Sequence, residues 1–187
     1  MPNATAMTQW FSLLIKKAPW FLLSLLVILL DQATKYWASS VLTYGDSLIF
    51  LPHFNFTLLH NYGAAFSFLA EQGGWQRIFF AAIAFSVSVF LVLWIVRSPN
   101  DKKLEVAGLS LILGGAVGNL WDRLYLGYVV DFVDWFYVAS GDCLPFFYRV
   151  FSTNSCHWPA FNIADGAILL GATLLIADML LSKPNSE

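Results

Sequence analysis

Charged residues are scarce in this sequence. Only 12% of its 187 residues are Asp, Glu, Lys or Arg, whereas a soluble domain carries roughly 25%. No stripe of basic residues with interleaved aromatics is present, so a nucleic-acid-binding surface is not expected. Hydrophobic residues instead make up 58% of the chain, and they gather in long runs. The composition therefore indicates an integral membrane protein rather than a soluble domain with a large core.

Cysteine is also rare, which limits the possible metal chemistry. The chain has two cysteines, Cys143 and Cys156, and the spacing of these residues and His157 is not that of a zinc site. We expect no metal and no cofactor. Twelve residues separate the cysteines, so a disulfide is plausible in an oxidising compartment, with two free thiols as the alternative.

Four apolar segments are long enough, or nearly so, to cross a bilayer, at about residues 20–38, 78–96, 104–124 and 161–181. We expect residues 1–187 to form a single, mainly α-helical membrane domain. Residues 1–18 would be a short lead-in, mobile or lying on the membrane surface. A cleaved signal peptide is the alternative for the first span, but no convincing small-residue cleavage site follows it.

The basic residues predict the orientation. One set of span ends carries most of them: Lys16, Lys17, Arg97, Lys102, Lys103 and Lys183. The loops at the other ends, about 39–77 and 125–160, hold only Arg77 and Arg149. Both termini should therefore be cytoplasmic and both long loops should face outward. Within the first loop, β-forming residues around Pro52 predict strands.

Ionisable residues within spans are functional candidates, because each costs about 2.5–3.5 kcal/mol on the insertion scale. Asp31 and Lys35 in "DQATK" share a helix face, and we expect an ion pair near the outer end of the span, with Lys35 free to extend outward. In "NYGAAF", residues 61–66, Asn61 offers an amide and Gly63 permits close backbone approach. A plain turn explains that segment nearly as well.

The third span contains the motif "GGAVGNLWDR", residues 114–123. Its small residues Gly114 and Gly118 make a helix-packing face. Three polar residues project to one side: Asn119, Asp122 and Arg123. The last two could neutralise each other or reach other partners, and a purely structural polar clamp is the alternative.

Two acids are expected at one depth on the outer ends of the last two spans. Asp131 follows the third span in "VVDFVD", and only one of Asp131 and Asp134 need point inward. Asp165 opens the fourth span in "FNIAD", where Asn162 could be a helix N-cap and Asp165 its capping-box partner. Two carboxylates that share a site cannot both ionise readily, which is the basis of aspartic-protease chemistry.

Other readings remain open at the level of the residues. Asp131 could be a solvated loop acid, and Asp165 could serve only the helix cap. A small membrane carrier or proton-relay protein would also place acids in spans, although such sites usually lie near the bilayer midplane. No Ser-His-Asp or Cys-His set is suggested, because the three histidines lie outside the apolar spans.

Five motifs occur in order over about residues 20–182: "DQATK", "NYGAAFSF", "GGAVGNLWDR", "VVDFVD" and "FNIAD". In these motifs and their order the chain resembles the lipoprotein signal peptidases, also called the signal peptidase II family. The resemblance implies an intramembrane aspartyl endopeptidase of the bacterial inner membrane, with four transmembrane helices and a small periplasmic β-cradle. Such an enzyme cleaves the signal peptide from prolipoproteins just before a diacylglyceryl-modified cysteine. Its partners would be that substrate and membrane lipid, and we expect a monomer with its active site at the periplasmic face.

By motif position, Asp131 and Asp165 match the catalytic pair of that family. Further positions match polar and small residues around the pair: Asn61, Gly63, Asn119, Asp122, Arg123 and Asn162. Asp31 and Lys35 match the first motif and are expected to be structural or supporting. One departure is the linker at about 137–160, which is longer than is typical for the family and contains both cysteines. It could cap or gate the site. A noncatalytic lipoprotein-binding subunit is a further alternative.

Overall fold

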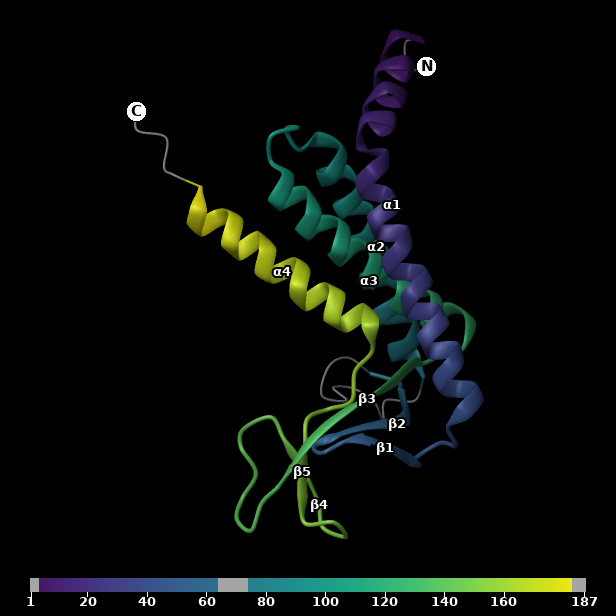
Figure 1. Cartoon of the computed structure of the whole chain (residues 1–187). Coiled ribbons are helices and arrows are strands. Elements are labelled where there is room, and N and C mark those ends of the chain that lie inside the picture. Colours follow the sequence, from purple (N-terminus) through teal and green to yellow (C-terminus); the bar gives the residue numbers. More distant parts are fainter. Residues whose placement is uncertain (1–3, 64–73, 183–187) are drawn as a thin grey trace.

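The structure is a computed structural model that describes residues 4–63 and 74–182, with side chains from residue 12 onward. Its elements, in chain order, are α1 (Ala4–Val41), β1 (Ser47–Leu51), β2 (Phe54–Asn61), α2 (Trp75–Arg97), α3 (Lys103–Tyr125), β3 (Val129–Val138), β4 (Tyr148–Val150), β5 (Ser155–His157) and α4 (Ile163–Leu181). Figure 1 shows that the helices form a bundle and that the strands lie together beyond one end of it.

Four helices in the described part of the chain are long and apolar enough to cross a membrane: Ser12–Val41, Trp75–Arg97, Lys103–Tyr125 and Ile163–Leu181. This confirms the predicted four-span membrane fold. Helix α3 contacts each of the other three helices and is the most buried of them. Large apolar side chains such as Leu22, Ile78 and Leu169 point outward instead, as expected for a surface that lipid covers.

Helix α1 begins much earlier than the sequence suggested. The expected lead-in at residues 1–18 is wrong for its described part, because the helix is continuous from Ala4 and passes through Pro19. Lys17 explains part of this difference. It is buried rather than at the surface, and its ammonium donates to the carbonyl of Ser98, which follows α2, at 2.8 Å. This contact holds the early part of α1 against the bundle.

The five strands form one antiparallel sheet in the order β1-β2-β3-β5-β4. The first loop supplies β1 and β2 on either side of Pro52, as predicted. The linker at 137–160 is partly sheet: β3 continues to Val138, and the segment between β3 and α4 adds the short strands β4 and β5. A disulfide joins Cys143 to Cys156 across this segment.

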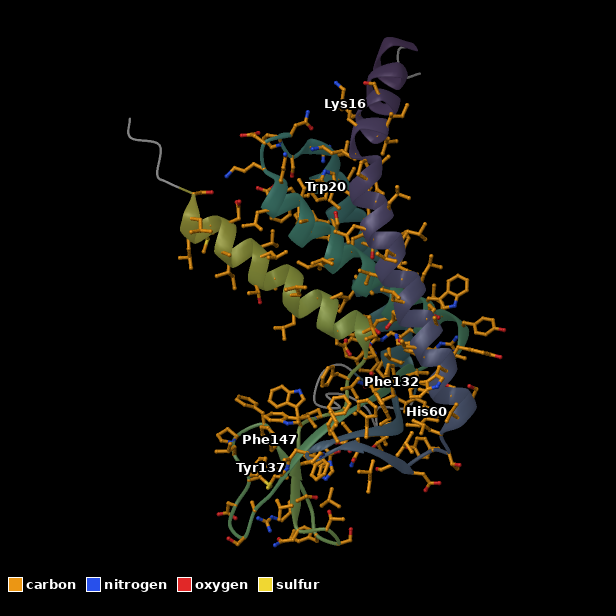
Figure 2. The ribbon with its side chains drawn as sticks, in the orientation of Figure 1. Lys16, Trp20, His60, Phe132, Tyr137 and Phe147 are labelled. Carbon is orange, nitrogen blue, oxygen red and sulfur yellow. A yellow bond between two sulfur atoms is a disulfide. The ribbon has the colours of Figure 1, made fainter. Side chains whose placement is uncertain are left out.

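The sheet is attached to α1 by a small apolar core. Leu58 of β2 and Val130, Phe132 and Val133 of β3 are buried together with Ala38, near the end of α1. Figure 2 labels Phe132 at this junction, and Lys16 and Trp20 on the part of α1 farther from the sheet. Because these apolar contacts fix β3 against the bundle, an acid on β3 has a defined position relative to the helix ends.

Glycines allow the backbones of α1 and α3 to approach closely. A Cβ atom on Gly114 would lie 2.6 Å from Cβ of Val27 and 2.8 Å from the carbonyl oxygen of Ser24. A Cβ on Gly118 would lie 2.6 Å from a carboxylate oxygen of Asp31. The predicted small-residue face of the third span therefore packs against α1 and leaves room for a buried acid.

This packing gives a testable prediction. Gly114→Ala should destabilise the protein by about 1–3 kcal/mol, because the added methyl group overpacks a rigid contact. Gly166→Ala in α4 is the matched control, since its added Cβ would meet no atom within 4 Å. The control should be neutral or slightly stabilising, as expected from helix propensity. Thermal unfolding in detergent measures both, and equal melting temperatures for the two variants would contradict the packing argument.

Candidate active site

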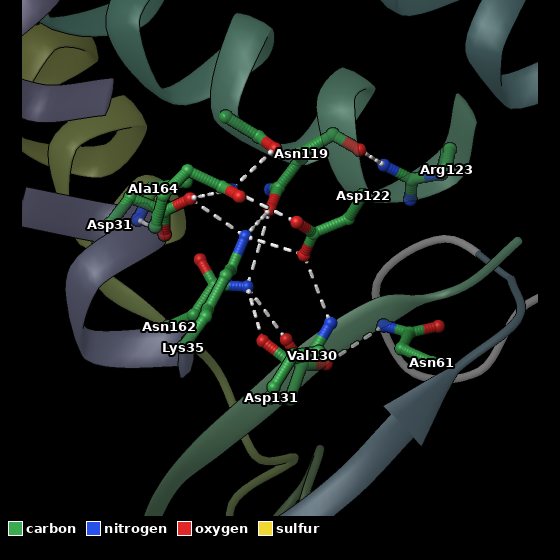
Figure 3. A network of polar contacts seen from close by, with 12 residues as sticks. Asp31, Lys35, Asn61, Asn119, Asp122, Arg123, Val130, Asp131, Asn162 and Ala164 are labelled. Atoms are coloured by element: carbon green, nitrogen blue, oxygen red, sulfur yellow. Dashed lines mark hydrogen bonds and ion pairs between the residues drawn. The ribbon is translucent and has the colours of Figure 1, made fainter. Parts of the chain in front are cut away.

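A cavity of about 1030 Å³ lies where α3, α4 and the sheet meet. Asp131 on β3 and Asp165 in the first turn of α4 both line it. Three more of the residues selected from the sequence line it as well: Asn61, Asn119 and Arg123. Figure 3 shows four of these side chains, those of Asn61, Asn119, Arg123 and Asp131, and the separate elements that carry them. The structure thus brings the two predicted acids into one cavity.

Asp131 is a buried acid held by neutral amides. Asn162 donates to its Oδ1 at 2.8 Å and Asn61 donates to its Oδ2 at 3.1 Å. Burial raises the pKa of Asp131 to about 7, and the nearby charge of Asp165 acts in the same direction. The two amide hydrogen bonds oppose this rise in pKa. Asp131 therefore changes its protonation state close to neutral pH.

The two carboxylate oxygens of Asp165 accept hydrogen bonds from different elements, one from the N-cap of α4 and the other from α3. It completes the predicted capping box, in which its backbone N–H donates to Oδ1 of Asn162 and its Oδ2 accepts from the N–H of Asn162. Its Oδ1 accepts from Asn119 at 2.8 Å. Asn162 contacts both acids, because its amide group also donates to Asp131. The cap and the cavity therefore depend on the same side chains.

Behind the acids, Lys35 is the centre of a buried ionic group. Its ammonium lies 2.8 Å from Asp31 and 2.9 Å from Asp122, and it donates to Oδ1 of Asn119 at 2.9 Å. The predicted pair of Asp31 and Lys35 is confirmed. The expectation that Lys35 extends outward is wrong: its side chain is only 3% exposed, because two carboxylates and an amide oxygen satisfy it inside the bundle.

Asp31 and Asp122 connect this ionic group to the elements that carry the acids. Oδ1 of Asp31 accepts from the backbone N–H of Ala164 at 2.9 Å, at the positive end of α4. Oδ2 of Asp122 accepts from the N–H of Val130 on β3 at 3.1 Å. Gln32 donates to both carboxylates, at 3.1 and 2.9 Å. Sequence reasoning missed Gln32, and its place inside "DQATK" was the available signal.

Arg123 binds backbone rather than Asp122. Its guanidinium donates to the carbonyls of Gly63, at 3.0 Å, and Asn119, at 3.2 Å. The N–H of Gly63 in turn donates to Oδ1 of Asn61. Arg123 therefore fixes the end of β2 and with it the amide that contacts Asp131. Residues 64–66 of the predicted motif lie outside the described part of the chain.

Two further groups near the site were not foreseen from the sequence. Arg77 donates to the carbonyls of Arg123 and Leu124, which closes the end of α3. Its position as one of few basic residues in the outer loops was a possible signal. His60 lines the cavity and stacks on Tyr128, with ring centroids 3.9 Å apart. Burial lowers the pKa of His60, so it is neutral at physiological pH.

Asp134 has a different environment although it is on the same strand. Residues three apart in a strand point to opposite faces, and Asp134 does not line the cavity. Its carboxylate contacts Nδ1 of His157 at 2.7 Å and accepts from Thr57 at 2.9 Å. Of the two acids in "VVDFVD", only Asp131 faces the cavity, as the alternation of a strand requires.

Comparison with known proteins gives consistent matches over most of the chain. A family model described as signal peptidase (SPase) II matches residues 23–181. A lipoprotein signal peptidase of Acinetobacter baumannii is 47% identical, over 95% of this chain and 92% of that protein. One from Coxiella burnetii is 49% identical, over 92% and 96%. A solved structure described as a bacterial membrane enzyme, determined by the in meso method at 2.3 Å resolution, superposes with a TM-score of 0.72 at 30% identity, over 91% and 92% of the two chains.

The buried ionic group gives a second prediction. Lys35→Met should cost about 3–5 kcal/mol of stability, because it leaves Asp31 and Asp122 without their cation. Lys16→Met is the control on the same helix, since the side chain of Lys16 is exposed, and it should change stability little. Chemical unfolding in detergent measures the difference. A Lys35→Met protein as stable as the control would show that the ionic group does not hold the bundle together.

Proposed function

Because this chain belongs to the signal peptidase II family, and is therefore a bacterial aspartic-type membrane protease that removes signal peptides from prolipoproteins, we propose that Asp131 and Asp165 are its catalytic pair. One observation carries the assignment: Asp131 and Asp165 line the same cavity, and the side chain of Asn162 forms a hydrogen bond with each of them. The family match disfavours the carrier and proton-relay alternatives.

In the proposed mechanism Asp131 holds the proton and Asp165 is ionised. The raised pKa of Asp131 favours its neutral form below about pH 7, and the N-terminus of α4 favours negative charge on Asp165. Asp165 takes a proton from water, and the resulting hydroxyl attacks the scissile carbonyl while Asp131 donates its proton to the carbonyl oxygen. As the tetrahedral intermediate collapses, Asp165 gives its proton to the leaving amine and Asp131 takes a proton back from the hydroxyl group of the intermediate, so that the pair again shares one proton.

We further propose that the substrate is a signal peptide followed by a diacylglyceryl-modified cysteine, bound as an extended strand. Strand β1 pairs with β2 only as far as Thr57, apart from an isolated bridge at Leu58. Leu59, His60 and Asn61 line the cavity beyond that point, and the side of β2 away from β3 has no strand partner there among the described residues. An extended peptide could pair along this edge. Membrane lipid would surround the enzyme, and we expect it to act as a monomer.

The proposed location is the bacterial inner membrane, with both termini cytoplasmic and the active site at the periplasmic face. Lys16, Lys17, Lys102 and Lys103 lie at the end of the bundle away from the sheet, as the positive-inside rule requires of the cytoplasmic end. The disulfide joins Cys156 of β5 to Cys143 in the segment before β4, where an oxidising periplasm would maintain it.

The catalytic assignment predicts that Asp131→Asn and Asp165→Asn each lower the cleavage rate by about 10²–10⁴-fold, because either change removes the acid–base partner. Asp134→Asn is the matched control, since it alters a buried acid on the same strand outside the cavity. The measurement is cleavage of a lipidated prolipoprotein by folded enzyme in detergent. Near-normal activity in either catalytic variant would reject the pair. EDTA should leave wild-type activity intact.

A pH prediction follows from the raised pKa of Asp131. The neutral form of this acid is lost as the pH rises, so kcat/KM should fall above about pH 7. Asn61→Leu removes a hydrogen bond that favours the ionised form, and the alkaline limb should move to higher pH. The two acids titrate as a pair, so the limb reports an apparent value. A limb that moves to lower pH in Asn61→Leu would contradict the assigned proton.

A further inference from the structure

The turn at residues 144–147 holds a phenylalanine in an unfavourable backbone conformation. The N–H of Phe147 donates to the carbonyl of Leu144 at 3.1 Å, with Pro145 in the second position of the turn and Phe146 in the third. Phe146 has a φ of +72°, a value for which turns normally use Gly or Asn at that position. A bulky residue keeps such a conformation only where its surroundings impose it.

Contacts on both sides of Phe146 hold this turn in place. The disulfide of Cys143 precedes it and connects to the fully buried Cys156 on β5. The N–H of Leu144 donates to the hydroxyl of Tyr137 on β3 at 2.7 Å. The ring of Phe147 makes edge contacts with three rings, those of Trp135, Tyr137 and Trp158. Figure 2 shows Phe147 and Tyr137 together at the base of this segment.

The fixed turn presents Phe146 to the cavity that contains the two acids. Its side chain is 69% exposed and lines that cavity. On α4, Ile168, Leu169 and Ala172 also line it, three, four and seven residues after Asp165, and therefore on the same helix face. One part of the cavity is thus an apolar strip that leads away from Asp165, with aromatic side chains from the disulfide-linked segment as a second apolar wall.

The chemistry of these walls selects the part of the substrate that they can hold. A peptide backbone placed between apolar side chains would lose hydrogen bonds to water and gain none. A hydrocarbon chain loses nothing there and gains from burial. The amide, guanidinium and imidazole groups that line the cavity belong to Asn61, Asn119, Arg123 and His60, and they suit the peptide better.

From these observations we propose that Phe146 contacts an acyl chain on the substrate's modified cysteine, and that the turn at 144–147, held by the neighbouring disulfide, is a substrate-binding element of the enzyme. This inference rests on the proposed function, because it takes the lipidated prolipoprotein as the substrate. It assigns to the long linker a role in binding, with Phe146 as the contact residue, and leaves the chemical step to the acids.

The test compares Phe146→Ala with Phe151→Ala, using a synthetic diacylglyceryl-modified prolipoprotein peptide in micelles. Phe151 is the matched control because it is 84% exposed in the same segment and does not line the cavity. Phe146→Ala should raise KM by about five- to tenfold, from loss of roughly half of the burial of a Phe side chain, with kcat within about twofold. Phe151→Ala should match the wild type. Equal KM values for the two variants would overturn the proposal.

A second arm identifies the ligand. Substrates with long and short acyl chains are compared at constant detergent and peptide sequence, so that bulk lipid cannot explain a difference. The effect of Phe146→Ala on KM should shrink with the shorter chains. An effect independent of chain length would place Phe146 on the peptide and overturn the acyl assignment. The double variant Cys143→Ala/Cys156→Ala should also raise KM, and less so when Phe146→Ala is already present.

Failure of this inference can be told from failure of the proposed function. Inactive Asp131→Asn and Asp165→Asn proteins combined with an unchanged KM in Phe146→Ala would overturn only the role of Phe146. Active Asp131→Asn or Asp165→Asn proteins would overturn the catalytic pair, whatever Phe146 does. The KM and kcat of each variant, measured on the same substrate, separate these outcomes.

Discussion

The candidate site depends on one buried cation, the ammonium group of Lys35. An ammonium group can only donate hydrogen bonds, so the amide of Asn119 must turn its oxygen toward Lys35. The NH₂ group of Asn119 is then free to donate to Asp165. Lys35 also forms ion pairs with Asp31 and Asp122, which bind backbone N–H groups of α4 and β3 respectively. A single charge therefore orients the elements that carry both acids.

The helix cap of α4 shows why a structural and a chemical interpretation of the same residues need not compete. Asn162 is an N-cap by geometry, and Asp165 completes the capping box. The same asparagine still has an NH₂ group, which it donates to Asp131. The cap thus fixes the first turn of α4 and, through one shared side chain, the position of an acid on another element. Local sequence patterns identified the cap, and only the fold shows the second contact.

Much of this arrangement was predictable from the sequence, and the exceptions have physical causes. The spans, the strands around Pro52 and the pairing of Asp31 with Lys35 follow from local periodicity and spacing. The burial of Lys35 does not, because it depends on Asp122 and Asn119, more than 80 residues away in sequence. The contacts of Gln32 with Asp122 and of Arg123 with Gly63 also join residues that are distant in sequence, so local spacing does not predict them. Partners distant in sequence are set by packing, which periodicity does not encode.

The acids of this protein differ in environment because their partners differ in charge. Asp31 and Asp122 each form an ion pair with the cation Lys35. Asp134 has an imidazole as partner. Asp131 receives its direct hydrogen bonds from two amides, Asn61 and Asn162, and its burial raises its pKa to about 7. Hydrogen bonds from neutral amides orient a carboxyl group without fixing its charge as firmly as a cation would. Asp131 can therefore gain and lose a proton while the ionic group around Lys35 stays unchanged.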